Sequence, residues 1–392
     1  MAEPANTPMP PGTPISATPR STSPAPPPPP LPAIFPPILP RSSSAPKPVV
    51  LHIGDPIKYN ANTYSAFSAL YTVIRPSTSE RQRPEFIRAL KDRRWGDFAA
   101  IFRPFWSTGG EMGAWDDELI ALLPPSVKVF ASAGAGFDWA DTKLLAERGI
   151  VYCNGGLAAA EAVADFAVAL IISTFRVLPY CIAAAASGEE KRFQECHDTA
   201  TARSRNLRSQ KLGLVGLGNI GQQIARKMDL AFGMEVLYYD VVRKTPEVEQ
   251  QLNVRFCKSL EELCRASDCL VLCTPSSGGT LINEQSLKWF KLGSRFVNIA
   301  RGSLVDEEAL ADALEQGRLS SVALDVHADE PKVHERLRAL AGDRALLTCH
   351  NAGGTVETHV GFEELAMRNI IAVLSGKQPI TPVNLQWLRS DS

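Results

Sequence analysis

The stretch KLGLVGLGNIGQQIARKM, residues 211 to 228, joins a short apolar run to three glycines in the pattern G-x-G-x-x-G and then to an amphipathic helical pattern. Gly216 permits a tight turn, Gly218 lets the backbone approach a pyrophosphate, and Gly221 lets the helix pack closely on the strand. The phosphate would lie at the helix N-terminus, where N–H groups and the helix dipole favour an anion. The stretch therefore predicts a strand, a dinucleotide-binding turn and a helix, with a turn that serves packing alone as the alternative.

A second apolar run, EVLYY, ends in Asp240, at about the 20-residue offset where an acid hydrogen-bonds the ribose 2′-hydroxyl of a dinucleotide. A carboxylate there repels a 2′-phosphate, so the sequence favours NAD over NADP. Arg243 and Lys244 follow within four residues and are able to pair with that phosphate. NADP therefore remains the alternative cofactor.

Short apolar runs alternate with helix-length segments from residue 48 onward, which predicts parallel sheets with helices on both faces. The helical stretch from Ala158 to about Leu178 separates four early runs from six later ones. We expect an α/β fold of two doubly wound parallel-sheet lobes. A flavodoxin-like substrate domain would cover residues 48–157, completed by about 352–392, and a Rossmann cofactor domain residues 158–351. The ten runs are VVLHIG, FAAIF, VKVFAS, IVYC, LGLVGL, EVLYY, CLVLC, RFVNIA, SVALDV and ALLTC.

The composition is that of an ordinary globular protein, with 45% hydrophobic and 21% charged residues among 392. A net charge of -1 offers no electrostatic footprint for nucleic acid or anionic lipid. The most apolar segment, FAVALII, is far shorter than the run of about 20 residues that spans a bilayer. The eight cysteines form no CxxC pair. We expect no nucleic-acid partner, no membrane and a reducing, cytoplasmic compartment.

The N-terminal segment differs from the rest, because 18 of the 30 prolines fall in the first 48 residues. Residues 1–47 have too little apolar periodicity to offset the entropy of ordering, and we predict a disordered tail. The run PAPPPPPLP is also compatible with a polyproline II ligand for an SH3-like partner. The pattern of a secretory signal or transit peptide is not present at this end.

Three segments place polar residues after later apolar runs: NIARGSLVDEEAL with Arg301, ALDVHADEP with Glu330, and LTCHNAGGT with His350. Ligands of open parallel sheets bind beyond the carboxyl ends of the strands, where these side chains would meet. An arginine fork binds a carboxylate, a histidine exchanges a proton, and a carboxylate keeps that histidine charged and oriented. Metal binding is not expected, because His327, Asp329 and Glu330 form no H-E-x-x-H and no CxxC pair occurs.

Together, GLGNIG with its later Asp, NIARGSLVDEEAL, ALDV with EP, and H-x-A-G-G-T resemble the D-isomer-specific 2-hydroxyacid dehydrogenase family over essentially all of residues 48–385. The resemblance implies that Arg301 binds the substrate, that His350 is the acid/base and that Glu330 is its partner. The backbone N–H groups of Ala133, Gly134 and Ala135 in SAGAGFDWAD would bind the substrate carboxylate. The implied cofactor residues are Gly216, Gly218, Asn219, Ile220, Gly221, Asp240, Thr274, Pro275, Ala300, Asp325 and Gly353.

Within that family, AGAGFDWAD, FAVALIISTFRVLPY, YYDV and DVHADEP are most similar to the fungal D-mandelate dehydrogenase branch. This implies an NAD-dependent oxidoreductase that moves a hydride between the nicotinamide and C2 of a bulky or aromatic 2-oxo or D-2-hydroxy acid, as a homodimer. Phe105, Trp106 and Trp139 would suit aromatic walls for such a substrate, or equally the core.

Two departures from the family pattern and two alternative functions accompany this resemblance. Cys349 replaces the proline usual before the catalytic histidine, and the loop TPSSGGTLIN is about two residues shorter than the common form. The first alternative is a glyoxylate or hydroxypyruvate reductase. The second, from another class, is an NAD(H)-sensing scaffold like the C-terminal-binding co-repressors, which the proline-rich tail would suit.

Overall fold

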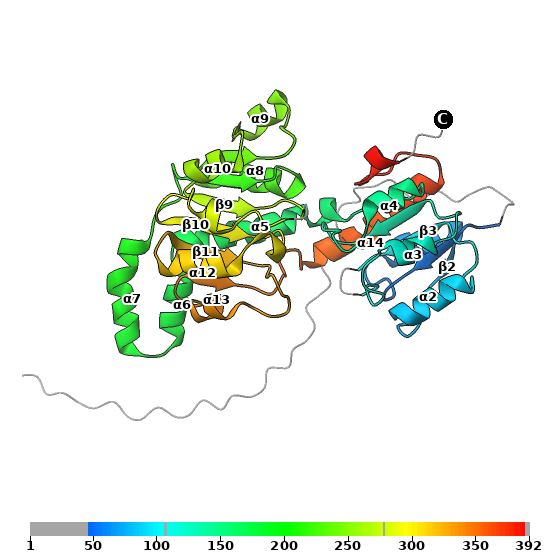
Figure 1. Cartoon of the computed structure of the whole chain (residues 1–392), viewed down its shortest axis with the longest axis horizontal. Helices are drawn as coiled ribbons and strands as arrows, with labels where there is room; N and C mark the ends of the chain where they lie inside the picture. Colours follow the sequence, from blue (N-terminus) through cyan, green and yellow to red (C-terminus); the bar gives the residue numbers. More distant parts are fainter. Residues whose placement is uncertain (1–45, 106–107, 277–278, 389–392) are drawn as a thin grey trace, which may run out of the picture. The chain divides into compact units, whose positions relative to one another are not determined.

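The computed structural model describes residues 46–105, 108–276 and 279–388. The predicted tail lies almost entirely outside the described residues, and the PAPPPPPLP run and Trp106 lie wholly outside them. The described chain forms two parallel β-sheets with helices packed on both faces of each (Figure 1). The predicted fold class of two doubly wound lobes is therefore confirmed.

The first sheet has five strands in the order β2-β1-β3-β4-β5, which is the flavodoxin-like order. Its strands are β1 (Val49–His52), β2 (Thr72–Ile74), β3 (Ala100–Arg103), β4 (Val129–Ser132) and β5 (Val151–Cys153). One face is covered by α1 (Ala61–Leu70) and α14 (Val356–Leu374), and the other by α2 (Arg83–Lys91), α3 (Asp117–Ala121) and α4 (Thr142–Glu147). The C-terminal helix α14 thus belongs to the lobe that the N-terminal strands begin.

The second sheet has seven strands in the order β12-β11-β10-β9-β6-β7-β8, which contains the Rossmann order with its reversal between β6 and β9. Its strands are β6 (Lys211–Val215), β7 (Glu235–Tyr239), β8 (Val254–Phe256), β9 (Cys269–Leu272), β10 (Ser294–Asn298), β11 (Leu319–Leu324) and β12 (Ala345–Leu347). Its helices include α5 (Gly156–Phe175), α8 (Asn219–Phe232), α9 (Pro246–Leu252), α10 (Leu260–Ala266), α11 (Glu284–Leu287), α12 (Glu307–Glu315) and α13 (Glu335–Ala339).

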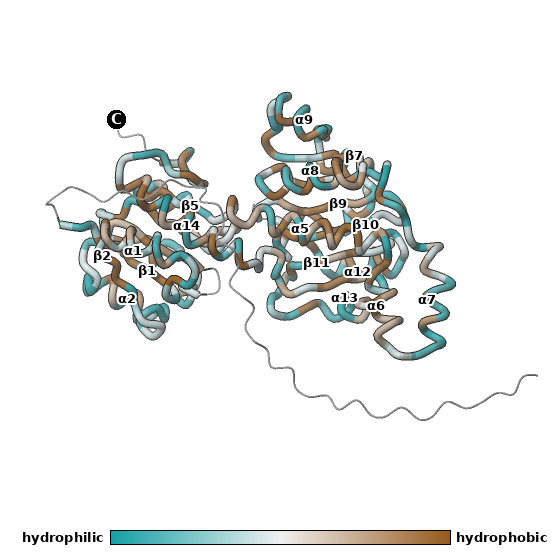
Figure 2. The backbone as a smooth tube through the Cα atoms, turned by 180° about the vertical axis from the view of Figure 1, so that it is seen from behind, coloured by the Kyte–Doolittle hydropathy of each residue, from teal (hydrophilic) through white to brown (hydrophobic). Residues whose placement is uncertain are grey.

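Two strands were not predicted, β2 in the first sheet and β8 in the second. Each has three residues, lies at an edge and is only partly buried, so neither carries the continuous apolar run of a central parallel strand. The central strands β4, β9 and β10 are buried throughout. Figure 2 shows the corresponding brown, hydrophobic backbone inside the layers of helices.

The predicted long helix over FAVALIISTFRVLPY is divided in two. Helix α5 ends at Phe175, Val177 takes a left-handed conformation with φ of 48°, and α6 (Leu178–Ala186) starts with Pro179 in its first turn. Proline fits the first turn of a helix but not its interior, which explains the break. Helix α7 (Glu190–Arg203) then packs against α6.

Helix α5 is, among the described residues, the one helix with the length and hydropathy to cross a membrane. It packs against α8 and against strands β10 and β11, and half of its most apolar window is buried in the protein. Its buried residues belong to the core on one face of the seven-stranded sheet. These contacts are those of a core helix, as the sequence predicted.

Candidate active site

A cavity of about 660 Å³ lies where loops at the carboxyl ends of both sheets meet. Parallel sheets of this kind bind ligands at that edge, because the loops after successive strands converge there. The structure brings most of the predicted site residues together around this cavity. They are Ala133, Gly134, Ala135, Gly218, Asn219, Ile220, Thr274, Pro275, Ala300, Arg301, Asp325, Glu330, His350 and Gly353.

The glycine-rich turn after β6 has the form that the sequence predicts. A Cβ at Gly216, whose φ is +97°, would lie 2.9 Å from Cys273 O, and a Cβ at Gly221 would lie 2.5 Å from Gly216 O. These two glycines therefore serve close packing and do not line the cavity. Gly218 has open space where a Cβ would be and precedes the first residue of α8 with no side-chain cap. The open space and the exposed helix start fit a dinucleotide pyrophosphate.

Asp240 follows β7 and anchors the same turn. Its Oδ2 accepts a hydrogen bond from Leu217 N at 2.9 Å and lies 3.6 Å from Lys244 Nζ. Asp240 is not among the residues that line the cavity itself. Its position beside the glycine turn is nevertheless that of the acid that binds a ribose diol in NAD-binding folds.

Asp325, predicted as a cofactor residue, organises the loop that carries His350. Its buried carboxylate accepts from Thr348 Oγ1 at 2.7 Å, Asn351 N at 3.0 Å and Ala352 N at 2.9 Å. Its backbone oxygen accepts from His350 N at 2.7 Å. His350 has a φ of 52°, a conformation that costs a non-glycine residue energy and persists when surrounding bonds impose it. Asp325 thereby fixes the direction of the histidine.

His350 and Glu330, the pair that the sequence predicts to transfer a proton, lie in direct contact. His350 Nδ1 lies 2.9 Å from Glu330 Oε2, and the two side chains are equally accessible, each 37% exposed. Burial raises the pKa of Glu330, but hydrogen bonds from His350 and from His327 N outweigh it, so its pKa lies below the usual value. Glu330 is therefore a carboxylate at neutral pH and accepts the hydrogen bond from His350 Nδ1.

The neighbouring His327 supports this pair through its backbone N–H. Its backbone N–H donates to Glu330 Oε1 at 3.0 Å, and its buried ring Nε2 lies 2.8 Å from Thr348 O. A Cβ at Gly302 would lie 1.9 Å from the backbone carbon of His327, so the glycine after Arg301 is required for this packing. Within the described ranges no group of three or more His, Cys, Asp or Glu side chains is arranged to hold a metal ion.

Arg301 follows β10 and faces the loop after β4. Its Nη1 donates to Ala300 O at 2.8 Å, and its Nε donates to Asp138 Oδ1 at 2.9 Å. A Cβ at Gly136 would lie 1.2 Å from Arg301 Nη2, so only glycine leaves room for the guanidinium. The sequence did not predict Asp138 as a partner of Arg301, although both are in motifs that it singled out.

The predicted carboxylate-binding loop needs one correction. The N–H of Ala133 donates to Arg103 O at 2.8 Å and so continues the ladder between β3 and β4. This amide is committed to the sheet, and the predicted amides are reduced to those of Gly134 and Ala135. The carbonyl oxygens of these two residues accept from Gly155 N at 2.7 Å and from Asn154 Nδ2 at 2.8 Å, which ties the loop to the end of β5.

Arg103 and Phe362 are among the residues of the cavity wall that sequence reasoning missed. Arg103 is the last residue of β3, and burial lowers its pKa. Its guanidinium lies 4.7 Å from the centre of the Trp139 ring, and its Nη1 donates to Ser132 Oγ at 3.2 Å. A polar residue at the end of the FAAIF run was a usable signal for Arg103, whereas Phe362 lies in α14 and has none.

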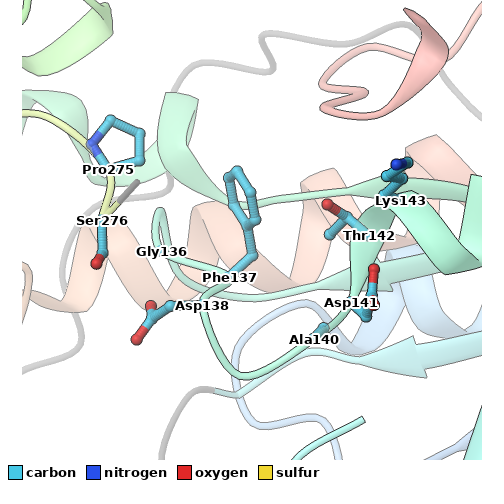
Figure 3. Close-up of a pocket in the computed structure, with 9 residues that line it drawn as sticks. All are labelled: Gly136, Phe137, Asp138, Ala140, Asp141, Thr142, Lys143, Pro275 and Ser276. Carbon is cyan, nitrogen blue, oxygen red and sulfur yellow. The ribbon is translucent and has the colours of Figure 1, made fainter. Parts of the chain in front are cut away.

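The three predicted aromatic residues have different outcomes. Trp139 lines the cavity, while Phe105 is buried outside that lining with its ring 6.3 Å from the His359 ring. Trp106 lies outside the described residues. A smaller groove of about 210 Å³ adjoins the cavity, and in it the loop from Gly136 to Lys143 meets Pro275 and Ser276 (Figure 3). The two spaces share Gly136, Asp138 and Pro275, so the groove continues the same site.

A glycine turn, a histidine–glutamate pair and an arginine around one cavity define a nicotinamide-dinucleotide oxidoreductase of two doubly wound lobes. The family model for the D-isomer specific 2-hydroxyacid dehydrogenase, NAD binding domain, matches residues 168–352. A glyoxylate reductase of Thermococcus gammatolerans is 37% identical over 267 residues, 68% of this chain and 78% of the relative. The chain belongs to the D-isomer specific 2-hydroxyacid dehydrogenase family.

Two further comparisons cover nearly the whole of the related proteins. The 4-methyl-2-oxopentanoate reductase A of Aspergillus oryzae is 31% identical over 86% of this chain and 98% of the relative. The apo crystal structure of D-mandelate dehydrogenase from Rhodotorula graminis matches with a TM-score of 0.81 and 40% identity over 86% of this chain and 98% of that one. The sequence-based recognition is confirmed, and the protein is an NAD-dependent oxidoreductase of 2-hydroxy and 2-oxo acids.

Proposed function

We propose that this enzyme reduces bulky 2-oxo acids, of the benzoylformate or 4-methyl-2-oxopentanoate kind, to D-2-hydroxy acids with NADH. The observation that carries the proposal is the wall of the cavity, which the aromatic surfaces of Trp139 and of the largely buried Phe362 line. Such surfaces stabilise an aryl or branched alkyl group by burial and ring contact. Similarity to a 4-methyl-2-oxopentanoate reductase and to a D-mandelate dehydrogenase, over 86% of the chain in both cases, supports the proposal.

The residues of the site have a division of labour for this reaction. Bound NADH supplies the hydride that C2 accepts. Arg301, with the amides of Gly134 and Ala135, holds the substrate carboxylate by charge-assisted hydrogen bonds. His350, bonded to Glu330 through Nδ1, donates the proton from Nε2 to the carbonyl oxygen as that oxygen becomes a hydroxyl. Oxidation uses the same pair in reverse, with a neutral imidazole as the base.

The second candidate is a reductase of small substrates such as glyoxylate or hydroxypyruvate. Arg103 supports it, because a buried guanidinium in the cavity wall is a better neighbour for a polar substrate than for an aryl group. Similarity to an archaeal glyoxylate reductase supports it as well. Both candidate functions use Arg301, Glu330 and His350, and they differ only in the substrate side chain that the cavity wall accommodates.

A substrate series separates the two candidates. The purified protein would be assayed with glyoxylate, hydroxypyruvate, 4-methyl-2-oxopentanoate and benzoylformate, each with NADH and with NADPH. We expect the highest kcat/KM for the bulky acids with NADH. Reduction of glyoxylate or hydroxypyruvate alone would reject the bulky substrate and support the second candidate.

We also propose that the protein is a cytoplasmic homodimer. Ile182 and Phe193 are 62% and 59% exposed on the hairpin of α6 and α7, and two large apolar residues on one hairpin fit a surface that a partner covers. We propose that a second copy of the chain covers these two residues. Light scattering would measure the mass in solution, and the variant Ile182→Asp should shift it from two chains toward one. A wild-type protein with the mass of one chain would reject the dimer.

A further inference from the structure

The loop between β7 and α9 contains an arginine, Arg243, whose guanidinium is held on one edge by a carboxylate. Arg243 Nε donates to Glu249 Oε1 at 2.9 Å, and Arg243 Nη2 donates to Glu249 Oε2 at 2.8 Å. Glu249 Oε1 also accepts from Tyr238 Oη at 2.6 Å. The guanidinium carbon lies 5.2 Å from the centre of the Phe256 ring. Arg243 is thus oriented by a two-pronged ion pair with Glu249 and by the ring of Phe256, and the phenol of Tyr238 orients Glu249 in turn.

The position of Arg243 is what makes this contact notable. It follows Asp240 by three residues, in the loop where NADP-binding proteins place a basic group for the 2′-phosphate. An arginine fork is well matched to a phosphate, so Arg243 at this position would favour NADP if its donors faced the ribose. Its donors instead face Glu249, which comes from the first turn of α9.

From this arrangement we infer that Glu249 is a cofactor-specificity residue, which holds Arg243 away from the 2′-phosphate position and so strengthens the preference for NAD. The inference rests on the proposed use of NADH. Asp240 opposes the phosphate directly, and Glu249 acts by removing the cation that would attract it.

The other groups around the loop make the contact between Glu249 and Arg243 persistent. Hydrogen bonds from Arg243 and then from Tyr238 lower the pKa of Glu249 to about 2, so its carboxylate is charged at every pH of interest. Tyr238 is buried in the core, and its phenol oxygen also accepts from Lys244 N at 3.0 Å. Lys244 Nζ in turn lies 3.6 Å from Asp240 Oδ2. Each of the two cations in the loop therefore has a carboxylate partner.

The test uses nucleotides that report on the adenosine end alone. Calorimetry would compare the Kd of 2′,5′-ADP with that of ADP for the full chain and for Glu249→Gln. Replacing the carboxylate by an amide keeps the shape of the side chain but weakens its hold on Arg243. Because the Arg243 side chain is 59% exposed and solvent screens the pair, we expect 2′,5′-ADP to bind about two- to fivefold more tightly, with little change for ADP.

Glu247→Gln is the matched control, because it removes the same charge from the same helix. Glu247 is exposed, and its pKa reflects hydrogen bonding to Thr245 rather than to Arg243. The double variant Glu249→Gln and Arg243→Ala also lacks the arginine. It should therefore lose the tighter binding of 2′,5′-ADP that we expect for Glu249→Gln alone. Tyr238→Phe serves as a second variant if Glu249→Gln folds poorly. It removes the hydroxyl that orients Glu249, so we expect a smaller increase in the affinity for 2′,5′-ADP.

The outcomes separate the inference from the function on which it rests. Wild type that binds 2′,5′-ADP more tightly than ADP would reject the NAD preference and, with it, the role of Glu249. Wild type that prefers ADP, with no gain in Glu249→Gln or with an equal gain in Glu247→Gln, would reject the role of Glu249 alone. Tighter binding of 2′,5′-ADP by the double variant, which lacks Arg243, would also reject the role of Glu249.

Discussion

The residues proposed for catalysis and those proposed for the substrate wall are held in place in different ways. Arg301, Glu330 and His350 follow the neighbouring strands β10, β11 and β12 of one sheet, and hydrogen bonds fix each of them. Trp139 and Phe362 come from a loop and a helix of the other lobe and are held mainly by packing. The chemistry thus depends on polar bonds within short motifs, whereas substrate selectivity depends on the fit of dispersed side chains.

Replacing the histidine should have the largest effect. His350→Ala removes the proton donor, and we expect turnover to fall by about 100-fold or more with every 2-oxo acid. The affinity for NADH should change little, because His350 touches the substrate end of the cavity and the glycine turn is intact. Steady-state kinetics measures the first effect and fluorescence titration with NADH the second. Near-normal turnover would remove His350 from the mechanism.

The arginine on each side of the cavity offers a matched pair of substitutions. Arg301→Lys should lower kcat/KM by about 10- to 100-fold on all substrates, because an ammonium cannot reproduce the fork that binds the carboxylate. Arg103→Lys is the same chemical change in the wall, and we expect a smaller loss that depends on the substrate. Equal losses for the two variants on every substrate would show that Arg103 also binds the carboxylate.

The glutamate controls pH dependence more than rate. Reduction needs a proton on His350, whose Nδ1 lies 2.9 Å from Glu330 Oε2. Glu330→Gln removes the carboxylate charge, so the decline of reduction with rising pH should move to lower pH. Oxidation needs the neutral imidazole, and its rise with pH should move lower as well. A change in rate with unmoved pH profiles in both directions would mean that Glu330 only orients the ring.

The same contrast explains how much of the molecule could be predicted from the sequence. The glycine turn, Arg301, Glu330 and His350 lie in contiguous motifs after apolar strands, and their roles follow from spacing and chemistry. The two missed strands, β2 and β8, are short edge strands whose identity comes from their neighbours in the sheet. Local sequence cannot supply that information, because pairing and not composition makes them strands.

The wall of the cavity escaped prediction for a related reason. Phe362 lies in α14, more than 220 residues after the loop that contains Trp139, and only the fold brings both to one cavity. Ala133 was misjudged because its amide is used by the β3–β4 ladder, a contact between segments 30 residues apart in the sequence. Asp138 was in a recognised motif, but its bond to Arg301 required the two loops to meet.

The smallest expected effect concerns the wall itself. Trp139→Ala should lower kcat/KM for benzoylformate by about fivefold, because an aryl group loses a ring contact of modest energy, and it should leave glyoxylate nearly unchanged. Trp139→Phe keeps an aromatic face and serves as the control, with a loss smaller than that of the alanine variant. The ratio of the two kcat/KM values is the useful measurement, because Trp139 also packs against Arg103 and Tyr152, and a general disturbance of that packing would cancel in it. Equal losses for both substrates would therefore assign Trp139 to the structure of the wall and leave the choice of substrate to other residues.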